Sequence, residues 1–422
     1  MNHLVFFGLN IYAWITIATV LGVFLTLLFT KVKPQIAFFM AIAIFHITGV
    51  LTIEEAFMGF DASSVITVGL LFIVIAGLRH TNALEWMVKH LMGQPRTYAR
   101  AIFRLMLPVG LLSSFMSNTA TTALFQDVVK LWSGKLNMKP SKLLIPLAYA
   151  ASIGGLLTLI GTPPNLIISG LYAKSSGNTI NLLATLPIGA VCLIVSTLVV
   201  VALRNFLPDR EPLEDKNVVS HSLDVKPTKK TYLSLTIMAL LLVVSATGLV
   251  SLTVCCLVAG ILMVVTRCCT SQQAEKEVDW SILLVFAGSV SIGTAVHKVG
   301  LDDLIVNNIL HTCGTNPYVV LTVVCLVAAT MTELLSDTAC GAMFFPIAWQ
   351  AAESLHVNPM PFMIALMICV SNSYATPIAT PPNTMVYATG GYRFADFARL
   401  GLVLKVVNLA IAIILSTLIY PF

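Results

Sequence analysis

Runs of about twenty apolar residues recur along the whole chain, separated by short polar stretches. A run of that length lets a helix cross the hydrocarbon core of a bilayer, which is roughly 30 Å thick. The first half predicts spans at 6–30, 35–51, 63–79, 143–172 and 183–204. The second half predicts spans at 231–250, 252–267, 280–297, 360–388 and 400–420. We therefore expect an all-α polytopic membrane protein.

Two further apolar segments, 102–130 and 318–353, lie between the third and fourth spans of each half. Each is too long for one span and too short for two, so we interpret both as re-entrant hairpins. A hairpin leaves on the side it entered, so each half crosses the membrane five times. Because five is odd, two halves joined in series have opposite orientations. The pattern predicts two inverted-topology repeats, 1–206 and 231–422, each with five spans, one re-entrant hairpin and one broken helix; a polar linker at 207–230 joins them.

Composition supports the membrane class and excludes several functions. The chain is 57% hydrophobic and 10% charged, with a mean hydropathy of +0.91, which no ordinary soluble domain shows. The first span is too long for a signal peptide and no Lys or Arg precedes it, so we expect it to be retained. The nine cysteines have no metal-binding spacing, and neither a nucleotide-binding loop nor a nucleophile–base set is present. We expect no enzymatic activity.

The basic residues indicate the orientation. In the hairpin topology, 21 of the 24 Lys and Arg fall on the side reached after the first span. The exceptions are Lys174 and Lys298 on the opposite side and Lys405 within the last span. Since positive loops stay in the cytoplasm, both termini are predicted outside and the linker 207–230 inside, with the protein in a plasma (bacterial inner) membrane. The net charge of +5 then reflects this bias and not nucleic-acid binding.

A pair of short motifs occurs twice. Ser-Asn-Thr at 117–119 and Gly-Thr-Pro-Pro-Asn at 161–165 recur as Ser-Asp-Thr at 336–338 and Ala-Thr-Pro-Pro-Asn at 379–383. The step between copies is 219 for the first motif and 218 for the second. Two linked motifs repeated at nearly one step indicate an internal duplication.

The residue types in these motifs favour ion and anion binding. A proline pair breaks a helix, and the freed carbonyls need a partner that lipid cannot supply, such as a bound cation. The half-helix after the break, like the second arm of each hairpin, begins with unpaired amides that attract an anion. Ser113 and Thr332 lie four residues before the tip serines, on the same helical face, and are candidate cation ligands.

The second hairpin tip carries two acids where the first has none. Asp337 stands at the position of Asn118, and Glu333 at the position of Ser114. Carboxylates inside a membrane point to function. Either they strengthen a cation site, or at least one of them carries a coupling proton. Our hypothesis is that Asp337 serves the coupling cation.

The sequence Ser-Asn-Thr-Ala-Thr-Thr at 117–122, with the 161–165 motif, resembles the divalent-anion:sodium symporter family, the solute carrier 13 group of the ion transporter superfamily. The resemblance extends over nearly the whole chain. It implies a homodimer that moves its hairpins and broken helices as a unit against a scaffold, an elevator mechanism. It also implies two sodium ions and a substrate site. The implied ligands are Ser113, Ser117, Asn118 and Gly161 for the first sodium; Thr332, Ser336, Asp337 and Ala379 for the second; and Asn118, Thr119, Thr338 and Pro381 for the substrate.

Sequence reasoning therefore predicts sodium-coupled symport of a small divalent anion, either a C4-dicarboxylate such as succinate or sulfate. The rival within transporters is a cation/proton antiporter that uses Asp337 and Glu333. An ion channel is the rival from another class, and the absence of a symmetric pore helix argues against it.

Overall fold

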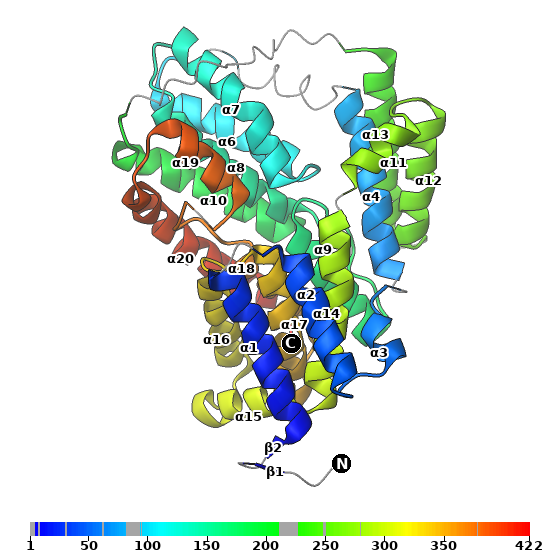
Figure 1. The fold of residues 1–422 in the computed structure, drawn as a ribbon. Helices are drawn as coiled ribbons and strands as arrows, with labels where there is room; N and C mark the ends of the chain where they lie inside the picture. Colours follow the sequence, from blue (N-terminus) through cyan, green and yellow to red (C-terminus); the bar gives the residue numbers. More distant parts are fainter. Residues whose placement is uncertain are drawn as a thin grey trace.

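Helices make up nearly all of the secondary structure in the computed structural model, so the predicted all-α class is confirmed (Figure 1). The structure describes residues 5–6, 9–29, 32–60, 63–81, 93, 95–210, 227–247, 250–278, 280–377 and 379–422. Most of the predicted linker, residues 211–226, lies outside this part of the chain.

The N-terminal end differs from the predicted span at 6–30. Strands β1 (Val5–Phe6) and β2 (Leu9–Asn10) pair in an antiparallel manner, and the first helix begins only at Ile11. The Asn10 side chain explains this boundary, because its Oδ1 accepts a hydrogen bond from the Ala13 amide at 2.7 Å and so caps the helix.

The helices of the first half follow the apolar runs closely and are interrupted at the two motifs. They are α1 (Ile11–Phe29), α2 (Pro34–Ile47), α3 (Ile53–Phe57), α4 (Ser63–His80), α6 (Tyr98–Ser113), α7 (Asn118–Lys135), α8 (Ser141–Gly154), the 3-10 turn η1 (Gly155–Leu157), α9 (Pro163–Ser176), α10 (Leu186–Ala202) and the 3-10 turn η2 (Arg204–Phe206).

The second half repeats this order. Its helices are α11 (Lys229–Thr247), α12 (Leu252–Val265), α13 (Ser271–Glu277), α14 (Trp280–Lys298), α15 (Leu301–Cys313), α16 (Pro317–Met331), α17 (Asp337–Ser354), α18 (Met360–Val370), α19 (Pro381–Gly390) and α20 (Phe394–Ile419). The sequence analysis did not predict α15, whose mixed polar and apolar residues hide it from a search for apolar runs. A hydrogen bond from Gln350 to Asp303 joins it to α17.

Most of the apolar helices that the structure describes have 10–17 residues, fewer than the predicted spans. Among the described residues, Phe394–Ile419 is the one unbroken helix both long and apolar enough to cross a membrane. The segments Val306–Thr312 and Pro317–Met331 meet the same test together, with a bend of 119° between them.

Each helix of the first half has a counterpart in the second half whose label is ten higher. In the following three cases two helices pack on each other, and their counterparts do so as well. Helix α2 packs on α14, and α12 packs on α4. Helix α7 packs on α19, and α17 packs on α9. Helix α8 packs on α19, and α18 packs on α9. A pseudo-two-fold relation between the halves produces this kind of exchange, so the contacts support the predicted repeat.

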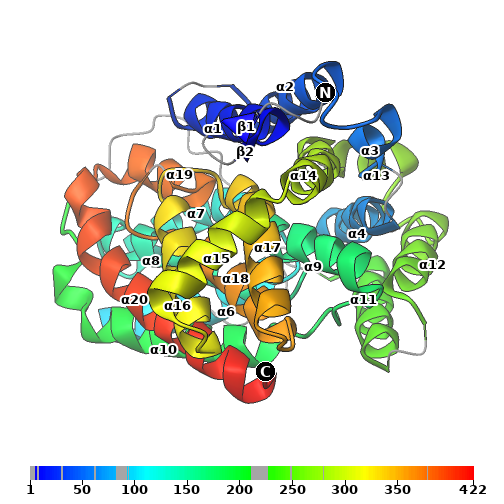
Figure 2. The same ribbon diagram turned by 90° about the horizontal axis from the view of Figure 1, so that it is seen from below.

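The broken helices lie at the centre of the molecule. Almost every residue of α8 and of α18 is buried, so the interruptions that follow them are also inside. In both views α4, α11 and α12 stand together on one side, with α10, α16 and α20 on the other (Figures 1 and 2). Helix α9 contacts α4, α17 and α18, and so connects the α4 side to the centre.

Candidate ion and substrate site

Two non-helical stretches interrupt the broken helices. Break one, residues 158–162, separates α8 and its 3-10 turn from α9, and break two, residues 371–380, separates α18 from α19. Thr162 and Thr380 have nearly the same extended backbone, with φ and ψ of −144° and 139° for the first and −135° and 151° for the second. A proline pair opens the helix that follows in each case, where a missing N–H costs little.

An asparagine at the equivalent motif position stabilises each break. The Asn165 side-chain amide donates to the carbonyl of Thr158 at 3.1 Å and, more weakly, to that of Gly155 at 3.5 Å. The Asn383 amide donates to the carbonyls of Thr376 at 3.0 Å and Ser373 at 3.1 Å. Both asparagines thus reach back seven and ten residues and satisfy carbonyls that the broken helix leaves free.

The first hairpin tip meets break one through Asn118. With its nitrogen turned toward these groups, the Asn118 amide donates to the carbonyl oxygens of Ala151 at 2.9 Å and Gly161 at 3.2 Å and to Ser113 Oγ at 3.0 Å. The opposite orientation of the amide brings its own oxygen to the same atoms. The oxygens of Ala151, Gly161 and Ser113 thus surround the end of the Asn118 side chain, and neutral oxygen groups of this kind are ligands that a small hard cation selects.

Two glycines allow this close approach. A Cβ on Gly155 would lie 2.7 Å from Asn118 Oδ1, and a Cβ on Gly161 would lie 2.6 Å from the Gly155 carbonyl oxygen. Neither distance accommodates a methyl group, so glycine at both positions keeps the carbonyls and the amide together. Ser117 lines a small pocket next to them with Gly161 and Pro163.

The second hairpin tip meets the beginning of break two. The Thr332 hydroxyl donates to the Val370 carbonyl at 2.6 Å and lies 2.9 Å from Ser373 Oγ. Ser336 caps α17 by accepting a hydrogen bond from the Ala339 amide at 3.3 Å. Asp337 Oδ1 accepts hydrogen bonds from the amide and the hydroxyl of Thr338, at 2.8 and 3.3 Å.

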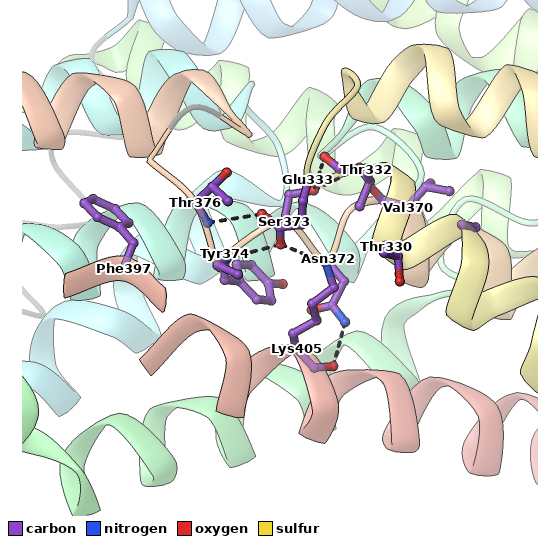
Figure 3. Close-up of polar contacts among 12 residues, drawn as sticks. Thr330, Thr332, Glu333, Val370, Asn372, Ser373, Tyr374, Thr376, Phe397 and Lys405 are labelled. Carbon is purple, nitrogen blue, oxygen red and sulfur yellow. Dashed lines mark hydrogen bonds and ion pairs between the residues drawn. The ribbon is translucent and has the colours of Figure 1, made fainter. Parts of the chain in front are cut away.

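Glu333 forms an ionic clasp between three elements (Figure 3). Its carboxylate pairs with Lys405 Nζ of α20 at 2.8 Å and accepts hydrogen bonds from the amides of Ala375 at 3.2 Å and Thr376 at 3.1 Å. The Asn372 side chain donates to the Lys405 carbonyl at 2.9 Å. The Glu333 and Lys405 side chains are only 10% and 12% exposed, so the pair is largely removed from solvent.

Among the described residues, several buried oxygens at or beside the breaks have no hydrogen-bond partner, and four of them occur at matching positions of the two motifs. These four are Thr162 Oγ1, Asn165 Oδ1, Thr380 Oγ1 and Asn383 Oδ1. Buried polar atoms are nearly always paired, so unpaired ones at a functional position suggest a missing ion, ligand or water. They occupy the same two positions in both copies of the motif.

The structure brings together the residues predicted for the first sodium. Ser113, Asn118 and Gly161 are in direct contact, and Ser117 lines the pocket beside them. In the second half Thr332 contacts the start of break two, whereas Ala379 lies at its far end, next to Thr380.

The substrate candidates lie at the starts of three helices. Asn118 and Thr119 open α7, Thr338 is in the first turn of α17, and Pro381 opens α19. Helices α7 and α19 pack together, and Gly341 of α17 lies against Pro164, where an added Cβ would be 3.3 Å from the proline Cβ. The segments of the two halves that carry the motifs are therefore in contact, whereas Thr119 and Pro381 are themselves exposed.

Sequence reasoning missed several residues of this region. It assigned no role to Asn165 and Asn383, although each is the last letter of a repeated motif, which was the available signal. It also missed Gly155 and Lys405. No sequence pattern links Lys405 to Glu333, because the two residues are 72 positions apart.

The chain matches the family described as citrate transporter (CitMHS) over residues 23–339 and 289–422. It is 32% identical over 209 residues to an uncharacterized transporter, sll0640, of Synechocystis sp., covering 49% of this chain and 33% of that protein. It is 24% identical over 363 residues to the sodium-dependent dicarboxylate transporter SdcS of Staphylococcus saprophyticus, covering 76% and 69%. It is 28% identical over 145 residues to human solute carrier family 13 member 4, covering 34% and 23%. The predicted kinship with the solute carrier 13 group is confirmed.

The fold is similar to that of the YdaH transporter of Alcanivorax borkumensis. The TM-score is 0.63 at 14% sequence identity, over 97% of each chain. At this identity the likeness concerns the fold alone.

Proposed function

We propose that this chain, which belongs to the citrate transporter family and is therefore a secondary transporter of the membrane, takes up a small divalent anion together with sodium. The anion is a C4-dicarboxylate such as succinate, or sulfate. The observation that carries this proposal is the convergence of the Ser113 hydroxyl, the Asn118 amide and two backbone carbonyls at break one. The dicarboxylate and the sodium dependence named for SdcS point the same way.

Sodium binds first, at break one. In one orientation of its amide, Asn118 donates through its nitrogen to the carbonyls of Ala151 and Gly161 and holds them together. When sodium arrives, the amide turns so that its oxygen joins those carbonyls and the hydroxyls of Ser113 and Ser117 around the ion. The amide nitrogen then points away from the ion and becomes available to an anion.

A second cation binds near Thr332, Ser336, Asp337 and Ala379, with the Asp337 carboxylate as the charged ligand. Glu333 is already engaged by Lys405 and two backbone amides, which leaves Asp337 as the acid free to respond to a cation. This difference favours symport over the antiporter, which needs both acids to exchange a cation for protons.

The substrate lies between the halves, at the N-terminal ends of α7, α17 and α19. Amides at a helix N-terminus and the nearby hydroxyls of Thr119 and Thr338 suit carboxylate or sulfate oxygens. Without bound cations the Asp337 charge repels a divalent anion, so cation binding completes the anion site. We expect a homodimer in which hairpins and broken helices move together against the remaining helices.

The test is flux into liposomes that contain the purified full chain. An inward sodium gradient should accumulate labelled succinate or sulfate, whereas an equal potassium gradient should not. Asn118→Ala should abolish accumulation, and the matched control Asn308→Ala, at an exposed asparagine of α15, should keep it. Proton release on adding sodium, with no anion required, would overturn the proposal in favour of the antiporter.

A further inference from the structure

A cavity of about 340 Å³ lies between α9, α14 and α17, away from both breaks. Each helix contributes one stripe of side chains to its wall. The polar and aromatic members are Lys174, Ser175, Ser289, Thr294, His297, Phe345, Trp349 and Glu353.

The cavity runs along α17 toward the second hairpin tip. The lining residue of α17 that is nearest to this tip along the chain, Ala342, is five positions after Asp337, a distance of about 8 Å along a helix. Helices α9 and α17 touch at their starts, through Pro164 and Gly341. Farther along, Tyr172 and Trp349 meet edge to face with ring centroids 5.9 Å apart, and the cavity opens beside them.

The mouth of the cavity is formed by the last turns of the three helices, which carry Lys174, His297 and Glu353. Lys174 makes no ion pair with any residue that the structure describes. By contrast Lys298, the other basic residue that the sequence places on this side, is paired with Glu55 at 2.6 Å. The surrounding protein partly desolvates the Lys174 ammonium and lowers its pKa. An approaching anion offsets that cost.

We propose that this cavity is an entry site in which Lys174 holds a small divalent anion before the anion reaches Thr338. The proposal rests on the proposed function and adds a second, earlier binding position to it. A lysine at the mouth of a low-dielectric cavity raises the local concentration of anions, which acts on capture more than on the later steps. The negative charge of Glu353, on the α17 wall, repels an anion and so keeps it close to Lys174 on the α9 wall.

The transport test compares Lys174→Gln with the matched control Lys298→Gln in liposomes. Lys174→Gln should raise KM for the anion about threefold to tenfold with little change in kcat, and should weaken the dependence of uptake on ionic strength. Lys174→Arg should restore both, and Lys298→Gln should behave as wild type. Unchanged KM and salt dependence in Lys174→Gln, with sodium-driven uptake intact, would overturn the entry site alone.

A second test needs no transport. Ser175→Cys places a thiol in the cavity, where an anionic sulfonatoethyl methanethiosulfonate should react several-fold faster than its cationic trimethylammonium analogue. Adding Lys174→Gln should remove that preference, and sulfate or succinate should slow the anionic reagent. If the two reagents react alike with Lys174 present, the cavity does not collect anions, whatever the transport assay gives. If Ser175→Cys shows the preference but neither it nor wild type shows sodium-driven uptake, the proposed function fails and the cavity stands.

Discussion

In each half of the molecule the hairpin tip is hydrogen-bonded to the break at equivalent positions, but the first link is neutral and the second is ionic. In the first half the Thr158 hydroxyl donates to the carbonyl of Ser114 at 2.5 Å, so the link is neutral. In the second half Glu333 stands at the position of Ser114, and its carboxylate accepts hydrogen bonds from Thr376, the counterpart of Thr158, and from Ala375. Lys405 of α20 neutralises that carboxylate, whereas α10, the counterpart of α20, contains no charged residue.

We infer from this difference that the two breaks depend to different degrees on a bound ion. In break two, an ion pair and two amide hydrogen bonds hold Ala375 and Thr376, so the geometry of this stretch does not depend on a bound ion. Break one is held by neutral groups whose oxygens converge near Asn118. We therefore expect sodium to order break one and to leave the backbone of break two nearly unchanged.

The largest expected effect comes from removing one member of the clasp. Lys405→Met leaves the Glu333 carboxylate buried without its counter-ion, which should lower the free energy of unfolding by about 3–5 kcal/mol. Thermal unfolding of the purified protein measures this loss. The double variant Glu333→Gln/Lys405→Met should recover most of it, because no isolated charge remains.

The matched control is Lys298→Met. Its pair with Glu55 is more exposed, at 42% and 27% for the two side chains, so the loss should be at most about 1 kcal/mol. Equal losses for Lys405→Met and Lys298→Met would remove the basis for calling break two preassembled.

The next largest difference between the two breaks should come from adding a methyl group to one and removing it from the other. In Gly161→Ala the new Cβ would lie 2.6 Å from the Gly155 carbonyl oxygen, so we expect a loss of about 1–3 kcal/mol and weaker sodium dependence of uptake. Break two already has alanine at the equivalent position, so Ala379→Gly should cost less than about 1 kcal/mol. Thermal unfolding with and without sodium reports both values, and a harmless Gly161→Ala would show that break one is not tightly built.

Exchanging the acid of the second tip should have a smaller effect. Asp337→Asn makes this tip resemble the first, and the half-saturating sodium concentration for uptake should rise about tenfold, equivalent to ~1.4 kcal/mol. Asp303→Asn, an acid of α15 far along the chain from both motifs, serves as the control and should leave sodium dependence unchanged. If Asp337→Asn also leaves it unchanged, Asp337 does not serve the coupling cation.

The smallest effects on stability should come from the unpaired hydroxyls. Thr162→Val and Thr380→Val remove buried oxygens that have no partner, so the free energy of unfolding should change by less than about 0.5 kcal/mol. Uptake should nevertheless fall about threefold in each, the value of one modest hydrogen bond to an ion or solute. Large losses of stability would mean that these oxygens support the fold instead.

Sequence patterns predicted most of the apolar helices but not the clasp. Proline pairs predicted interruptions at 161–165 and 379–383, because proline disrupts helical hydrogen bonding. In the structure the non-helical residues, 158–162 and 371–380, come before the prolines, which open the helices that follow. The start of α1 was predicted too early, since a capping asparagine and a short strand pair do not interrupt hydrophobicity. Helix α15 was missed because it is amphipathic.

The site was predictable only in part, for a similar reason. Repetition of a motif at a constant step pointed to Ser113, Asn118 and Gly161, which the structure brings into contact. It could not reveal that Glu333 is neutralised, because its partner comes from a different helix in a segment without a recognisable motif. Charges on separate elements become a pair only through packing, and periodicity carries no information about that.

Hydrogen exchange at the two breaks tests the central claim most directly. The backbone amides of residues 158–162 and 373–376 are compared in sodium and in potassium, by mass spectrometry on the full chain. We predict that sodium slows exchange in break one about tenfold or more, equivalent to ~1.4 kcal/mol of added protection, while Ala375 and Thr376 are already protected in potassium. Equal responses of the two breaks, or protection by sodium at break two alone, would contradict the account.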